Sequence, residues 1–229
     1  VAEAHFGYEQ LAEVCEAAAF EAESARDPNA IAAAAARLHH HMRTLRGAPA
    51  DGEGTFAAFV FERMMSHPGY SGSVGQRVAE MLQNTPDEFH DELKTCLEPR
   101  PPLLWLHQLR SEDYAGTAAT LRGLSETGAQ GAGSATLAER RRYLSLAKLS
   151  LLADGVSSSS DNIIDIDAAL DLAAIQSRLA RRRGADGDGD APLPPLRLVE
   201  ACLNEGEGAG GPGSEDDLLD AFATFASAG

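Results

Sequence analysis

Residues 136–154 read TLAERRRYLSLAKLSLLAD and form the most informative stretch of the sequence. Thr136 followed by Glu139 is a capping-box pattern, which predicts that a helix starts here. Its apolar residues recur at helical spacing on two sides. Leu137, Leu144, Ala147 and Leu151 make one stripe, and Tyr143, Leu146, Leu149 and Leu152 extend the apolar arc around a second side. Either the chain itself covers both sides, as around a central solenoid helix, or one side is a docking surface for another protein.

Similar helix signals continue in both directions from this stretch. We expect helices near residues 3–24, 28–46, 56–67, 78–82, 86–97, 103–109, 112–127, 137–154, 161–183, 196–203 and 215–225. Alanine and leucine dominate, and the alternating patterns that strands need are hard to find. The sequence therefore predicts an all-α fold, an irregular α-solenoid of roughly ten or eleven helices.

The loop segments between the predicted helices divide the chain into three parts. Residues 1–102 are expected to form an upstream solenoid part, and residues 103–183 the central helices with the candidate docking helix at 136–154. Residues 184–229 combine linkers with short terminal helices.

Two further helix starts are predicted upstream of residue 136. Thr85 with Glu88 predicts a second capping box, and Ser111 is expected to cap the helix that follows it.

Charge and cysteine content exclude several classes of protein. The net charge of −16 repels nucleic acid and anionic lipid, so we expect no direct nucleic-acid binding and no membrane contact from this segment. Three widely spaced cysteines predict reduced, buried thiols. The apolar runs are shorter than a membrane span, and no signal pattern is seen. Because the chain begins at Val1 without an initiator methionine, we suspect an excerpt from a longer protein.

Candidate catalytic and ligand-binding patterns are incomplete. Ser145 and Lys148 match an S-x-x-K pattern, but the companion motifs of that enzyme class are missing. The acidic run 186–190 lacks the glycine and the glutamate of a calcium loop, and residues 39–41 are consecutive histidines that point three ways around a helix. The basic run 178–183 fits a helix end better than an import signal. The sequence predicts no catalytic residue, no metal site, no cofactor and no small-molecule ligand, and hence no enzyme.

Three runs in fixed order carry a resemblance to a known family. They are Leu103-Leu-Trp-Leu-His107, then Tyr114 with the run from Ala118 to Leu124, and then the run from Tyr143 to Asp154. In order and spacing they resemble the carboxy-terminal α-helical region of the nucleoporin 133 family. Weaker similarity extends over nearly the whole chain, and only residues 103–157 are specific.

This resemblance implies a structural subunit of the Y-shaped coat that builds the outer rings of the nuclear pore complex, at the nuclear envelope. It implies tail-to-tail docking with a nucleoporin 107 family protein, in contact with other Y-complex nucleoporins, and a role in nucleocytoplasmic transport of mRNA and protein. The family contact maps onto Leu149 and Leu152, with Arg141, Arg142 and Lys148 as basic partner-binding neighbours. The β-propeller of family members, with its membrane-sensing loop, has no counterpart here.

Two other interpretations remain open at this point. The nucleoporin 155 family has a similar run of leucine and tryptophan followed by an alanine-rich helix. Membership of that family would place the protein in the inner ring of the pore. A vesicle-coat or adaptor solenoid is the other alternative, because helical arms are shared by many trafficking proteins and fold does not fix function.

Overall fold

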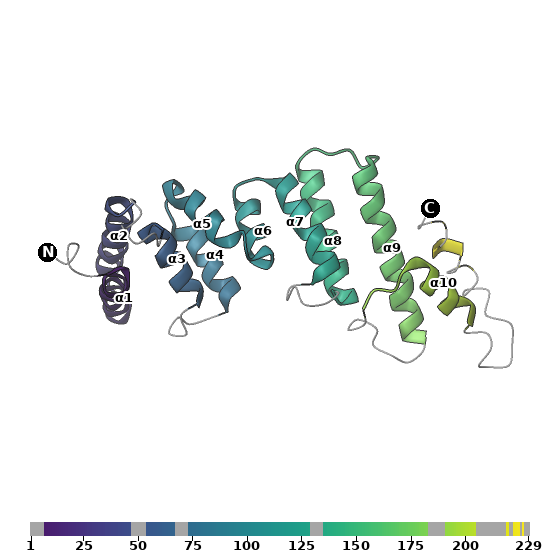
Figure 1. Ribbon diagram of the computed structural model, residues 1–229, viewed down its shortest axis with the longest axis horizontal. Coiled ribbons are helices and arrows are strands. Elements are labelled where there is room, and N and C mark those ends of the chain that lie inside the picture. The colour runs from purple at the N-terminus through teal and green to yellow at the C-terminus, as the bar shows by residue number, and fades with distance from the viewer. Residues whose placement is uncertain are drawn as a thin grey trace. The chain divides into compact units, whose positions relative to one another are not determined.

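The computed structural model describes residues 7–46, 54–66, 73–128, 135–182 and 191–204, together with 219, 222–224 and 226. Within these ranges every regular element is helical: ten α-helices and one 3-10 helix, η2. The all-α class is therefore confirmed (Figure 1). The predicted helix starting at Ser214 and the acidic run 186–190 lie largely or wholly outside the described residues.

The chain divides into two compact units, Val1–Leu103 and Leu104–Gly229. In the first unit two longer helices are followed by shorter ones that pack together. In chain order the helices are α1 (Tyr8–Ala25), α2 (Pro28–Thr44), α3 (Phe56–Ser66), α4 (Val74–Asn84), η2 (Asp87–Phe89) and α5 (His90–Leu97). The helices α1 and α2 form a hairpin, in which Asp27 caps α2 by accepting a hydrogen bond from the Asn29 amide and Pro28 occupies the first turn.

The core of the first unit gathers around α3. Its apolar stripe buries Phe56, Val60, Phe61 and Met65, and Tyr8 of α1 packs edge-on against Phe56 with ring centroids 5.3 Å apart. The short helices have too little surface to fold alone, so this shared core has to stabilise them.

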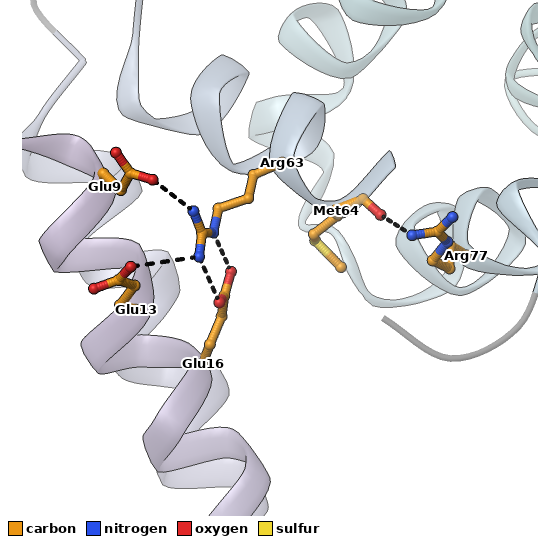
Figure 2. A network of polar contacts seen from close by, with 6 residues as sticks. All are labelled: Glu9, Glu13, Glu16, Arg63, Met64 and Arg77. Carbon is orange, nitrogen blue, oxygen red and sulfur yellow. Dashed lines mark hydrogen bonds and ion pairs between the residues drawn. The ribbon is translucent and has the colours of Figure 1, made fainter. Parts of the chain in front are cut away.

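A guanidinium ties α3 to α1 beside this core (Figure 2). Arg63 of α3 donates to both carboxylate oxygens of Glu16, with Nε–Oε1 at 2.6 Å and Nη2–Oε2 at 3.1 Å, and Glu9 and Glu13 lie at 3.5 and 4.0 Å. The Arg63 side chain is only 11% exposed. A bidentate pair fixes orientation as well as distance, so it sets how α1 lies against α3.

Two predicted helix starts are wrong. Thr85 ends α4, and the following residues form η2 before α5 begins at His90. Glu88 accepts from Arg43 and Arg46 of the α2 end instead of closing a capping box. In the same way, α7 (Tyr114–Thr127) is capped by Asp113, whose carboxylate accepts from the Gly116 amide at 2.9 Å. In both places a charged partner nearby stabilises a different arrangement from the one that the local pattern predicts.

The second unit contains the longest helix of the described ranges. After α6 (Pro101–Arg110) and α7 come α8 (Leu137–Ala153), α9 (Asp161–Arg182) and α10 (Pro195–Asn204). Figure 1 shows α7, α8 and α9 side by side as consecutive antiparallel neighbours, with a short loop between α8 and α9. One apolar core joins them, and a smaller one joins α9 to α10 through Ile175, Leu179, Leu198 and Cys202.

The three cysteines are buried free thiols, as the sequence predicts. Burial raises the pKa of the Cys96 thiol from its ordinary value of 9.0 to about 11, with Glu62 adding to the shift and Arg100 opposing it. The pKa of Cys15 is also raised, mainly by burial. Because the thiolate is the reactive form, these cysteines are structural rather than chemical groups.

Candidate partner-docking surface

The helix α8 begins where its sequence predicts. The Thr136 hydroxyl accepts from the Glu139 amide at 3.2 Å, and the Glu139 carboxylate accepts from the Thr136 amide at 2.9 Å. This reciprocal capping box satisfies two amides that have no partner within the helix. It fixes the first turn of α8, and so the rotation of every side chain that follows.

The first apolar stripe of α8 faces the core. Leu137, Leu144, Ala147 and Leu151 are all buried, and the last three pack with α7 and α9 around Leu121, Ile163 and Ile166. The predicted core stripe is therefore confirmed.

The second apolar side of α8 is covered at one place and open at another. Tyr143 and Leu146 are partly buried and pack against the same core cluster. Burial is also the main reason why the pKa of Tyr143 is raised, with Glu139 adding to the shift and Arg142 opposing it. Leu149 and Leu152, in contrast, are 62% and 41% exposed. The second unit thus hides half of the additional apolar arc and leaves these two leucines in water.

The basic residues predicted to flank the leucines have different environments. Arg142 is exposed and Arg141 is half-buried. Lys148 is engaged within the unit, because its Nζ lies 2.5 Å from Oδ1 of Asp167 on α9. The sequence reasoning missed Asp167, since nothing local in the sequence says which residue of α9 lies opposite Lys148.

The surroundings of α8 contain no catalytic arrangement among the residues that the structure describes. Ser145 is exposed, and the ammonium group of Lys148 is held by a carboxylate. A cavity of about 270 Å³ between α8, α9 and residues 192–195 is lined mainly by leucine, alanine and proline. Its glutamine, Gln176, is already bonded to the backbone of Ala191 and Leu193.

The same described ranges carry neither a metal-binding cluster nor a membrane-spanning helix. They hold no group of three or more histidine, cysteine, aspartate or glutamate side chains placed to bind a metal ion. None of the described helices combines the length and the apolar character that crossing a bilayer requires.

Antiparallel helices that pack as successive neighbours, with an exposed apolar pair on a central helix, are typical of α-helical scaffold proteins. Sequence comparison places the chain more narrowly. Residues 15–189 match the profile of the family described as non-repetitive/WGA-negative nucleoporin C-terminal, and the chain belongs to this family.

A named relative agrees with this assignment. The chain is 26% identical over 166 residues to the nuclear pore complex protein NUP133 of Arabidopsis thaliana. The match covers 66% of this chain and 12% of that protein, so the chain spans a small part of its relative. The predicted resemblance to the carboxy-terminal region of the nucleoporin 133 family is confirmed.

Proposed function

We propose that this chain is part of a structural subunit of the nuclear pore complex, in the Y-shaped coat of the outer rings. In this proposal it docks tail to tail with a nucleoporin 107 family protein and so supports nucleocytoplasmic transport at the nuclear envelope. Its role is mechanical rather than catalytic. The observation that carries the docking step is the exposure of Leu149 and Leu152 on a helix whose other large apolar residues are buried or partly buried.

Exposed leucines on an otherwise packed helix favour a protein partner. Single exposed apolar residues are common on protein surfaces, but Leu149 and Leu152 lie one turn apart and form a continuous apolar spot. Removing this spot from water would stabilise a complex. Arg142 and Arg141 lie about two to three turns before it on α8, where they can pair with carboxylates of a partner.

The net charge favours a protein partner over nucleic acid. At −16 the chain repels phosphate backbones, and Arg140–Arg142 is a local basic cluster within this negative background. An acidic surface of another protein would be attracted to that cluster, and this attraction would help to set the orientation of docking.

Affinity purification of the full-length protein from its native cells tests the proposal. The other Y-complex nucleoporins, including a nucleoporin 107 family protein, are expected at equal stoichiometry, and the tagged protein is expected at the nuclear rim. Recovery of inner-ring nucleoporins would favour the nucleoporin 155 family interpretation instead. Cytoplasmic puncta with vesicle-coat subunits would reject a pore function altogether.

A further inference from the structure

The apolar spot on α8 has a neighbour on α9 that lies off the core stripe of that helix. Ile163 and Ile166 of α9 are buried in the core, whereas Ile164 is 53% exposed. Ile164 lies in the first turn of α9, beside Asp165, and is not part of the apolar core cluster of the second unit.

The ion pair between Lys148 and Asp167 sets the register of the two helices. It joins α8 and α9 at a distance of 2.5 Å, and the helices are antiparallel neighbours (Figure 1). Leu152 lies one turn after Lys148, and Ile164 lies one turn before Asp167. In an antiparallel pair these two steps go in the same direction along the helices, toward the connecting loop.

We infer that Ile164 completes the docking surface, so that the surface spans both helices and takes an amphipathic helix of another protein. This inference rests on the proposed function and names a further residue and the chemistry of the partner at that site. Leu149, Leu152 and Ile164 form an apolar triangle at the loop end of the α8–α9 pair. The partner helix lies across this triangle with apolar side chains at positions i and i+3 or i+4.

Charges of both signs lie around the triangle: Asp154, Asp161 and Asp165 are exposed at its loop end, and the exposed Arg142 lies on α8 away from the loop. Arg142 precedes Leu149 by two helical turns, which is about 10 Å along α8. A partner helix that covers the triangle and follows α8 therefore carries a carboxylate about two turns from its apolar pair. The surface thus selects a helix with an apolar end and an acidic end.

Binding of the purified chain to the carboxy-terminal region of a nucleoporin 107 family protein from the same species, measured by titration calorimetry, tests the inference. Ile164→Asp is expected to weaken binding about tenfold or more, because an apolar contact is lost and a carboxylate must be desolvated. The variant keeps its fold, since an acidic residue in the first turn of a helix is favoured by the helix dipole. Ile164→Leu is expected to bind like the wild type.

Leu196 on α10 provides the matched control, because it is 70% exposed and lies away from the triangle. Leu196→Asp is expected to leave the affinity unchanged. If Leu149→Asp weakens binding and Ile164→Asp does not, the inference fails while the proposed function stands. If the wild-type chain does not bind the nucleoporin 107 region, both fail. If light scattering shows that the wild-type chain is a dimer and that the Ile164→Asp variant is a monomer, the surface binds a second copy of the chain. That result would overturn the inference.

Discussion

Replacing both exposed leucines of α8 by aspartate is expected to separate binding from folding. Leu149 is 62% exposed and Leu152 is 41% exposed. Complete burial of a leucine side chain contributes roughly 1.5–3 kcal/mol. Scaled by the fractions still exposed, burial of the pair in a complex contributes roughly 1.5–3 kcal/mol in total. This corresponds to roughly a 10- to 150-fold change in Kd before the added carboxylates are considered.

The added charges increase the loss of affinity without unfolding the chain. An aspartate in the interface would have to be desolvated, so binding to the nucleoporin 107 region is expected to become undetectable by co-elution. In the free chain the new side chains remain in water, and substitutions at such positions change stability by only about 0.5 kcal/mol. Circular dichroism and the thermal unfolding midpoint should therefore match the wild type.

A control pair with similar exposure makes the result specific. Leu109 on α6 and Leu196 on α10 are 43% and 70% exposed, so Leu109→Asp with Leu196→Asp adds the same charge at a similar apolar cost. The control variant should co-elute with the partner. Retention of co-elution by the Leu149→Asp and Leu152→Asp variant, with its fold intact, would refute the assignment of the docking surface.

Three further predictions concern stability and reactivity. Arg63→Met should destabilise the first unit by roughly 1–3 kcal/mol in urea unfolding, because Glu16 loses its bidentate partner in a partly buried site, and an unchanged midpoint would show that the pair is not stabilising. Thr136→Ala should cost about 1 kcal/mol through loss of the capping box with Glu139, seen as a lower thermal midpoint of the second unit, and the idea fails if helix α8 melts as before. The raised pKa of Cys96 stabilises the fold fully below its ordinary value of 9.0, and this contribution is lost as pH rises toward about 11. Cys96→Ala should therefore flatten the alkaline part of the stability profile, whereas an unchanged slope would assign it to other groups.

Features that depend on a few neighbouring residues could be predicted from the sequence. The start of α8 at Thr136, the cap of α2 at Asp27 and the buried stripe of α3 all follow from spacing within one or two helical turns. The start signals at Thr85 and Ser111 were misleading. At Thr85 the deciding contact came from outside the segment, through Arg43 and Arg46, and at Ser111 a carboxylate two residues further on took the cap.

The two apolar sides of α8 can be predicted without coordinates, because helical periodicity is a local property. That neighbouring helices cover Tyr143 and Leu146, and leave Leu149 and Leu152 open, follows from the packing of the second unit. The contact of Asp167 with Lys148 likewise depends on the packing of α9 against α8, and the inferred role of Ile164 rests on that contact. Exposure depends on where neighbouring helices end and in which register they pack, and that information lies in contacts between residues far apart in the chain.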